Sequence, residues 1–384
     1  MITTFVLMSI ASGASFLLGF LLVNHPLKIN ATANRWLGVF ITTLGLAMLE
    51  ILLISQNLSA SYPYYIELIG ISRFITAPAL YLTVCTFTSL DQSFKKKYLL
   101  HFIPLFIILL FRLPFFVTGQ NPEFPEAARK VVFFIIQSVL PVQSVVYWIL
   151  SYKKLQQHLR NINTFSSVTE NIDLSWLKSF LFLLLVILLI WFNLLYFDIQ
   201  LVKDFTPFFY LVCIFFLAYF SLQQREIFKY SPAEIEDLSE VVTGNTSPKA
   251  EKTKRLSNEQ LAVLNQKLIH LMEVEKLYLD NELNLPDLSS KINASSNETS
   301  YLINEIYDVN FYTFINTFRI EEAKKLLKSE QYTKLNILGI AYQSGFNSKT
   351  TFNTAFRKIT GKSPTEYIRQ EETKETAEKN NEKK

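Results

Sequence analysis

Two patterns of hydrophobic and polar positions divide this chain. Up to residue 222 the apolar residues run in unbroken stretches of roughly 20, the length of helix that crosses a bilayer. Beyond that point they recur every three or four positions, as on one face of a soluble helix. There are seven apolar stretches, which cover residues 2–23, 36–55, 65–87, 99–117, 131–150, 177–197 and 205–222. The pattern predicts an all-α fold in which a seven-helix transmembrane bundle precedes a soluble helical domain.

Residues 335–369 have the capping and turn residues that are typical of a helix-turn-helix unit. Asn336 is placed to cap a short helix over 337–344, and Gly345 can supply the left-handed backbone of a turn between crossed helices. A second helix is expected over 349–360, with one apolar side and one side rich in amide, hydroxyl and basic groups. Such groups read base edges and bind phosphates in a major groove. The predicted DNA contacts of this unit are Asn347, Ser348, Lys349, Thr350, Asn353, Arg357 and Lys358.

A weaker copy of the same pattern begins at Asn284. Asn293 occupies the position that corresponds to Gly345 in the other unit. Asparagine adopts the left-handed backbone conformation more readily than most residues. A second reading helix is expected over 297–307, capped by Ser295 or Ser296. Its outward side supplies the predicted DNA contacts Asn297, Glu298, Ser300, Tyr301 and Asn304.

A helix over 311–330 is expected to join the two units. It would be about 30 Å long, and units held rigidly apart in this way can enter successive major grooves, which lie roughly 34 Å apart.

Residues 258–370 resemble the DNA-binding domain of AraC-type transcriptional regulators. The resemblance rests on the paired units, on RIEEAKKLL at 319–327, on IAYQSGFNSKTTF at 340–352 and on FRKITGKSPTEYIR at 356–369. It implies a seven-helix module that binds specific double-stranded DNA, usually as a homodimer, with RNA polymerase as a further candidate partner. The first unit departs from the second because its reading helix carries Glu298 and no Lys or Arg. Residues 72–106 also resemble the membrane region that precedes such domains in some bacterial regulators.

The distribution of Lys and Arg among the short loops predicts an orientation. Loops on one side hold Lys28, Arg35, Lys95, Lys96, Lys97, Lys153, Lys154, Arg160, Arg225 and Lys229, and those on the other hold Arg129, Lys130 and Lys203. The richer side is expected to be cytoplasmic, which puts the N-terminus outside a bacterial inner membrane and the C-terminal domain inside. No basic region precedes the first stretch, so a cleaved signal peptide is not expected.

Polar side chains within the spans are costly in a bilayer and are therefore functional candidates. In the predicted orientation they lie in the outer half of their helices, or near the middle. We predict a sensor pocket for an unknown small ligand, with Glu50 or Glu67 pairing with Arg73; the alternative is that these side chains tie helices together or reach lipid headgroups. The candidates are Glu50, Glu67, Arg73, Arg112, Gln137 and Asn193.

The pattern divides the chain into four parts: a transmembrane sensor region (1–222), a cytoplasmic linker (223–257), a DNA-binding domain (258–370) and a disordered charged tail (371–384). One feature of the third part has two interpretations. Leu261, Leu264, Leu268 and Leu271 suit either a dimer seam or packing onto the domain that follows.

The predicted function is that of a membrane-anchored one-component transcription regulator. With 50% hydrophobic and 18% charged residues, the chain is too apolar to be wholly soluble and must contact membrane lipid. One alternative is a membrane transporter or receptor whose cytoplasmic tail binds a protein. A membrane enzyme is another, against which stands the absence of motifs such as HExxH and GxSxG. No metal or cofactor is expected, because the 2 cysteines and 4 histidines are scattered.

Overall fold

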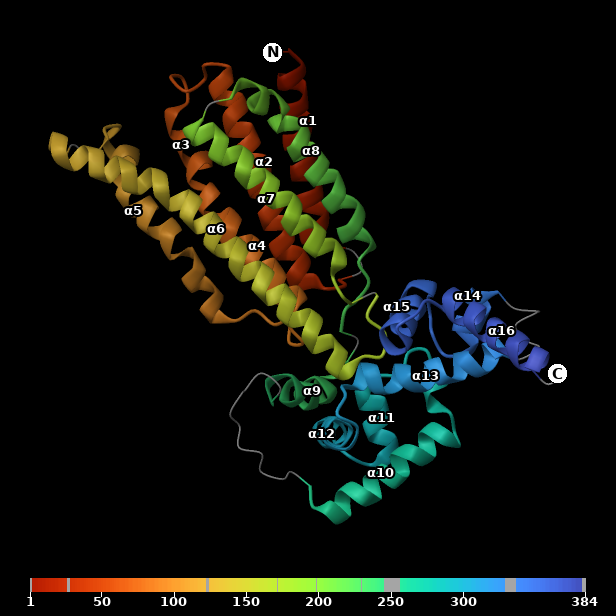
Figure 1. The fold of residues 1–384 in the computed structure, drawn as a ribbon. Coiled ribbons are helices and arrows are strands. Elements are labelled where there is room, and N and C mark those ends of the chain that lie inside the picture. Colours follow the sequence, from red (N-terminus) through yellow and green to blue (C-terminus); the bar gives the residue numbers. More distant parts are fainter. Residues whose placement is uncertain are drawn as a thin grey trace. The chain divides into compact units, whose positions relative to one another are not determined.

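The computed structural model describes residues 2–25, 28–121, 124–170, 172–197, 199–228, 230–244, 256–328 and 336–381. These residues are almost entirely helical, and the only β pairing among them is an isolated bridge between Ser166 and Asn284. The chain forms two compact units, which are described separately (Figure 1). Unit 1 consists of Met1–His158 and Leu174–Phe228, and unit 2 of Leu159–Asp173 and Lys229–Lys384. The domain boundaries predicted at 222, 257 and 370 remain predictions.

Unit 1 contains the apolar helices. Seven segments among the described residues are long and apolar enough to cross a membrane, as the sequence pattern predicts. The helices are α1 (Ile2–Val23), α2 (Ala31–Ser55), α3 (Pro63–Ile71), α4 (Arg73–Phe87), η1 (Lys96–Phe102), α5 (Ile103–Thr118), α6 (Glu126–Phe165), α7 (Ser175–Tyr196) and α8 (Gln200–Gln223). The third stretch is broken at Ser72 into α3 and α4, and the fourth begins as a 3₁₀ helix. The fifth lies within α6, which at 40 residues is much longer than the predicted span and ends in unit 2.

Small residues let α1 and α2 pack closely, as is common between helices in membranes. A Cβ atom on Gly38 would lie 2.8 Å from the carbonyl oxygen of Gly19, so a larger residue at this position would separate the helices. Ser12 Oγ donates a hydrogen bond to the carbonyl oxygen of Gly45 at 3.0 Å. The pairing of α1 with α2 therefore depends on backbone proximity rather than on large interlocking side chains.

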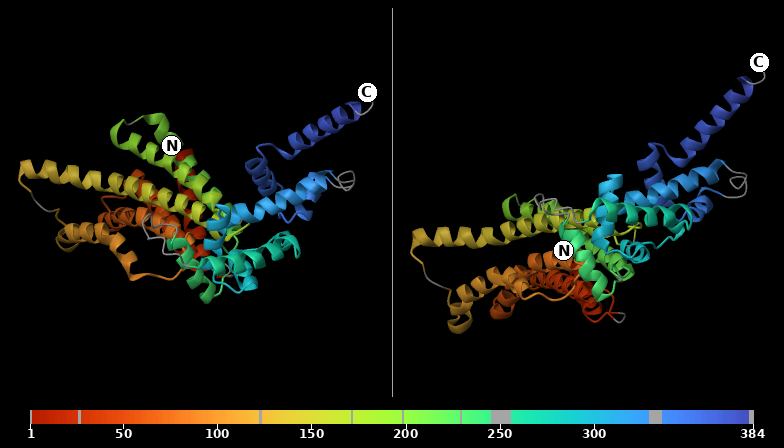
Figure 2. Two further views of the ribbon diagram at one scale, coloured as in Figure 1. Left: turned by 60° about the horizontal axis from the view of Figure 1, so that its bottom comes forward. Right: turned by 90° about the horizontal axis from the view of Figure 1, so that it is seen from below.

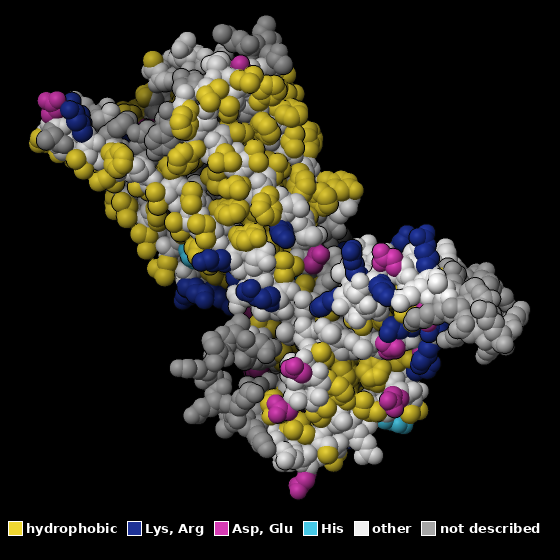
Figure 3. All heavy atoms as spheres, viewed as in Figure 1, with side chains coloured by type: hydrophobic (Ala, Val, Ile, Leu, Met, Phe, Trp, Pro, Cys, Tyr) yellow, Lys and Arg dark blue, Asp and Glu magenta, His cyan; other side chains and the backbone are white. Residues whose placement is uncertain are grey.

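The outer surface of unit 1 is apolar. Leu110 on α5 is 70% exposed and Val117 is 75% exposed, and α5 has no buried residue. Figure 3 shows hydrophobic side chains over most of the visible face of this unit. Apolar surface on this scale is not left facing water in soluble proteins, and it suits contact with lipid tails.

Unit 2 contains two helix-turn-helix pairs, α11–α12 and α14–α15, which α13 joins (Figure 1). Three buried leucines of α10, Leu261, Leu268 and Leu271, point into this unit. Their burial fits the interpretation that α10 packs onto the domain that follows it, rather than the interpretation that it forms a dimer seam. The helices are α9 (Pro232–Gly244), α10 (Asn258–Glu273), η2 (Leu277–Leu279), α11 (Leu285–Ile292), α12 (Ser296–Tyr307), α13 (Phe311–Lys328), α14 (Ile337–Gln343), α15 (Lys349–Thr360) and α16 (Pro364–Asn381).

An aromatic core holds the second helix-turn-helix pair to α13 and α16. Phe346, Phe352 and Phe356 are each at most 1% exposed and contact one another edge to face, and Tyr367 of α16 continues the series. Ile320 and Ala323 of α13 belong to the same buried cluster. This packing fixes the angle at which α15 is presented.

The expectation of a disordered tail needs correction. The structure continues α16 as a helix to Asn381, and Figure 2 shows it projecting from the rest of unit 2. The residues concerned include Glu, Lys, Gln and Ala, which are strong helix formers, so the local propensity outweighs the high charge. Residues 382–384 lie outside the described part of the chain.

Candidate nucleic-acid interface

The second helix-turn-helix pair is built as its sequence predicts. Asn336 caps α14 by accepting a hydrogen bond from the Gly339 amide at 2.9 Å. Gly345 has φ +87°, the left-handed conformation that the turn requires. Ser348 caps α15: its Oγ accepts a hydrogen bond from the Thr351 amide at 3.1 Å. These local bonds fix where α15 begins.

The polar side of α15 is accessible. Lys349, Thr350 and Arg357 are exposed, whereas Asn347, Ser348 and Asn353 are half-buried. Lys358 is exposed too, but its ammonium group lies 5.5 Å from the centre of the Tyr312 ring on α13. Figure 3 shows Lys and Arg side chains gathered around α15 and α16. Among the predicted contacts, Lys349 and Arg357 are therefore the cations best placed to meet a phosphate backbone.

The first pair, α11–α12, is capped in the same way as the second, but its reading helix carries no Lys or Arg. Asn284 accepts a hydrogen bond from the Asp287 amide at 3.0 Å, and Asn293 has φ +57° in place of the glycine. Ser295 caps α12 in a capping box, in which the Glu298 carboxylate accepts from the Ser295 amide at 2.8 Å and from its hydroxyl at 3.0 Å. Glu298 thus stabilises the start of α12, and its predicted contact with DNA remains a prediction.

One residue predicted to face outward does not. Ser300 is buried, with 7% of it exposed. Its carbonyl oxygen also accepts a hydrogen bond from Asn304 Nδ2 at 2.8 Å. Asn304 is exposed, and Asn297 and Tyr301 are half-buried.

A buried arginine, which the sequence analysis did not single out, joins the parts of unit 2. Arg319 of α13 is 0% exposed, and it donates to the carbonyl oxygens of Tyr278 at 2.7 Å and Asp280 at 2.6 Å. Its guanidinium carbon also lies 5.7 Å from the centre of the Phe346 ring. Burial lowers the pKa of Arg319 to about 10, which leaves it charged at neutral pH. Its spacing on α13, four residues after the buried Ile315, is the signal that could have revealed it.

The segment Leu159–Asp173, which consists of the end of α6 and the chain that follows it, belongs to unit 2. Its Ser167 is fully buried, and Ser167 Oγ donates to the carbonyl oxygen of Leu283 at 2.5 Å. The same hydroxyl accepts from Arg319 Nη2 at 3.2 Å, and the Ser167 carbonyl accepts from Asn316 Nδ2 at 3.3 Å. A piece of chain that the sequence analysis assigned to the membrane region thus completes the polar core of the DNA-binding unit.

The sensor candidates of unit 1 form two separate ion pairs. Arg73 Nη2 lies 2.7 Å from Glu50 Oε2, which is one of the two pairings predicted. Glu67 pairs instead with Arg112, whose Nε lies 2.5 Å from Glu67 Oε1. Asn193 is buried, and the side chain of Gln137 lies outside the described part of the structure. Four of the six candidates therefore form two ion pairs.

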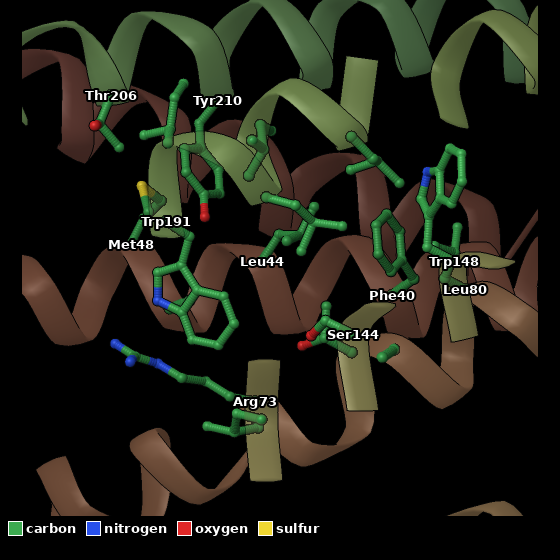
Figure 4. Close-up of a pocket in the computed structure, with 18 of the residues that line it drawn as sticks. Phe40, Leu44, Met48, Arg73, Leu80, Ser144, Trp148, Trp191, Thr206 and Tyr210 are labelled. Atoms are coloured by element: carbon green, nitrogen blue, oxygen red, sulfur yellow. The ribbon is translucent and has the colours of Figure 1, made fainter. Parts of the chain in front are cut away.

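One of them lines a cavity. A space of about 320 Å³ within unit 1 is bounded by Arg73, by the hydroxyl-bearing Thr76, Ser144, Thr206 and Tyr210, and otherwise by apolar and aromatic side chains. Figure 4 shows Arg73, Thr206 and Tyr210 toward one end of this space, and Phe40, Leu80 and Trp148 toward the other. The cavity thus has a polar end and an apolar end.

Comparisons with known proteins concern the C-terminal part. Residues 288–370 match the family described as "Helix-turn-helix domain". An uncharacterized HTH-type transcriptional regulator of Staphylococcus aureus strain COL is 32% identical over 114 residues, which are 29% of this chain and 15% of that protein. Another, from Escherichia coli strain K12, is 32% identical over 104 residues, 26% of this chain and 36% of that protein. No solved structure matches this chain.

The family match lies within unit 2, and this chain covers 15% and 36% of these two relatives, which is less than two thirds of each. The match agrees with the resemblance noted in the sequence and with the geometry of α14 and α15, which are capped and joined by a glycine turn. Residues 288–370 therefore form a helix-turn-helix domain, and the two relatives are described as HTH-type transcriptional regulators.

Proposed function

We propose that this chain is a membrane-anchored, one-component transcription regulator that binds specific double-stranded DNA and is controlled by a signal received in unit 1. One observation carries the proposal: seven helices fit to cross a membrane precede a helix-turn-helix domain whose α15 exposes Lys349 and Arg357. The bias of Lys and Arg among the loops supports a multi-pass orientation in a bacterial inner membrane with the C-terminal domain in the cytoplasm.

We further propose that the active form is a homodimer. Joining two DNA-binding modules makes the second binding event intramolecular, which can tighten binding about 10²- to 10⁴-fold. Contact with membrane lipid follows from the exposed apolar surface of unit 1. RNA polymerase would be the partner through which a regulator of this kind acts.

Removing the two exposed cations of α15 tests the DNA-binding half. The double variant Lys349→Ala, Arg357→Ala should lose about 2 to 4 kcal/mol of binding free energy, roughly 30- to 1,000-fold in affinity, because two phosphate or base contacts disappear. The measurement is genome-wide chromatin capture of the full-length protein in its membrane. A control variant, Lys267→Ala with Lys325→Ala, removes the same charge from α10 and α13 and should keep its peaks.

Two outcomes of that experiment would count against the proposal. Peaks that persist in the double variant would mean that α15 does not read DNA. The absence of peaks for the wild-type protein under all growth conditions would favour the alternative, a transporter or receptor whose tail binds a protein.

The cavity in unit 1 is our candidate for the signal site. Glu50 offsets the charge of Arg73, while Arg73 Nε is buried with no hydrogen-bond acceptor among the described residues. The ligand that suits these walls is uncharged and largely apolar, with a hydrogen-bond acceptor at one end. A volume of about 320 Å³ is at the lower limit for ligand pockets and limits the ligand to a small molecule.

Filling the cavity should remove the response to the signal. Ala47 lines it, and Ala47→Phe would place a ring in the space that a ligand would occupy. We expect reporter output from a target promoter to become constant across growth conditions that change the wild-type output, with chromatin peaks retained. Leu110→Phe, at an exposed position of α5, is the matched control. A normal response in Ala47→Phe would rule this cavity out as the signal site.

A further inference from the structure

Carboxylates from outside the helix-turn-helix pairs occupy the start of both reading helices. At α12 they come from α9, which packs against it. Asp237 Oδ2 accepts a hydrogen bond from the Ser296 amide at 2.9 Å, and Glu240 Oε2 accepts from Asn297 Nδ2 at 3.3 Å. Leu238 and Val241 of α9 are buried, which anchors this helix in unit 2.

At α15 the carboxylate comes from the segment Leu159–Asp173. Glu170 accepts a hydrogen bond from Ser348 Oγ, the hydroxyl group that caps α15. This segment is held in place by the buried contacts of Ser167 with Leu283 and Arg319 and by the bridge between Ser166 and Asn284. Two segments that are distant in sequence therefore each place a carboxylate at the start of a reading helix.

The start of a reading helix is where DNA would bind. The first amides of a helix lack partners within the helix, and together with the helix dipole they attract anions, phosphate above all. The N-terminal residues of a recognition helix are also those that contact base edges. At α12 the Asp237 carboxylate occupies one of these amides, and at α15 the Glu170 carboxylate bonds to the hydroxyl that caps the helix. Each carboxylate has the same sign of charge as a phosphate and lies where the phosphate would bind, so the two cannot bind together.

We propose that α9 and the segment Leu159–Asp173 are built-in competitors of DNA, and that the structure is the DNA-excluding state of the regulator. The proposal rests on the proposed function, because it requires that α12 and α15 bind DNA. Asp237, Glu240 and Glu170 are the competing groups. Both competitor segments are continuous with membrane helices: α9 follows α8, and the other segment consists of the end of α6 and the chain that leads to α7. A rearrangement in unit 1 could therefore draw their carboxylates away from the starts of α12 and α15.

The test measures the affinity of the full-length protein in lipid nanodiscs for a duplex taken from the strongest chromatin peak of the wild-type or variant protein. The triple variant Asp237→Asn, Glu240→Gln, Glu170→Gln should bind about 10- to 100-fold more tightly than the wild type, and each single variant about 2- to 5-fold more tightly. A control triple variant, Glu236→Gln, Glu259→Gln, Glu282→Gln, removes three exposed carboxylates of the same unit. It should change the affinity by less than about twofold, because exposed charges are screened by salt.

An equal gain in both triple variants, or no gain in the first, would overturn the proposal. Adding Lys349→Ala and Arg357→Ala to the first triple variant separates this failure from that of the proposed function. If α15 does not read DNA, these changes will have no effect on binding in any background. If only the competition is wrong, they will abolish binding while the carboxamide substitutions make no difference.

A second measurement does not depend on any substitution. Hydrogen exchange of peptides that cover 232–244 and 159–170 is recorded before and after the duplex is added to the wild-type protein. We expect exchange in both peptides to rise as the segments leave α12 and α15. Unchanged protection with DNA bound would show that DNA and these segments coexist, against the proposal.

Discussion

Replacing Arg319 with methionine should unfold or severely loosen unit 2. The guanidinium donates to the carbonyl oxygens of Tyr278 and Asp280 and to the side-chain oxygens of Ser167 and Asn316. Methionine can fill much of the space but would leave these buried acceptors without donors. At about 1 to 3 kcal/mol for each unsatisfied group, the expected loss is roughly 4 kcal/mol or more, a large part of the stability of a typical domain.

Hydrogen exchange of the full-length protein in nanodiscs can measure this loss. All 4 tryptophans lie in unit 1, so intrinsic tryptophan fluorescence would not report on unit 2. Amides of η2 and α13 should exchange much faster in Arg319→Met. Lys325→Met changes a side chain that is 74% exposed on the same helix and should have little effect. Wild-type protection in Arg319→Met would mean that the buried arginine is not what joins these parts.

Gly345→Ala should be the second most damaging change. A Cβ atom at this position would lie 2.5 Å from the Tyr278 carbonyl oxygen and 2.9 Å from Leu279 Cα. Both are backbone atoms, so the clash cannot be relieved by a change of side-chain rotamer. The left-handed conformation adds its own cost of about 1 to 2 kcal/mol for a residue with a side chain. With an overpacking cost of about 1 to 3 kcal/mol, the total is roughly 2 to 5 kcal/mol, and α15 should shift relative to α13.

Gly361 supplies a matched control for this substitution. It ends α15 with φ +76°, but a Cβ atom there would meet nothing within 4 Å. Gly361→Ala should therefore cost only the conformational part, about 1 to 2 kcal/mol. Exchange rates of α14 and α15 amides should rise in the order wild type, Gly361→Ala, Gly345→Ala, and the affinity for the duplex should fall in the same order. Equal effects of the two alanines would show that the close approach at Gly345 is relieved at no cost.

The sequence predicts the features of this protein that obey local rules. Span lengths follow from runs of apolar residues, and the limits of α14 and α15 follow from Asn336, Ser348 and the two glycines. The capping box of Ser295 and Glu298 obeys a local rule as well, although we read Glu298 as an outward contact. The capping pattern is therefore visible in the sequence, and the contact of Glu298 with DNA stays a prediction.

Long-range contacts were beyond the sequence. The burial of Ser300 depends on how the other helices of unit 2 pack on α12, and the choice of Arg112 as the partner of Glu67 depends on how α3 meets α5. Nothing in the periodicity around Ser167 indicates that it would bond to Leu283 and Arg319, because these partners lie 116 and 152 residues away in the chain. Such pairings are set by tertiary packing, and a single sequence carries no pattern for them.

The place of Leu159–Asp173 in unit 2 has a consequence for how the protein is made. Two candidate spans, α7 and α8, separate this segment in the chain from the rest of its unit. Two crossings return a chain to the side of the membrane that it left, so both parts of the unit can meet. During synthesis Ser167, which bonds to Arg319, is made before α7 and α8, and Arg319 is made after them. This part of the polar core of unit 2 can therefore form only once α7 and α8 have been synthesised.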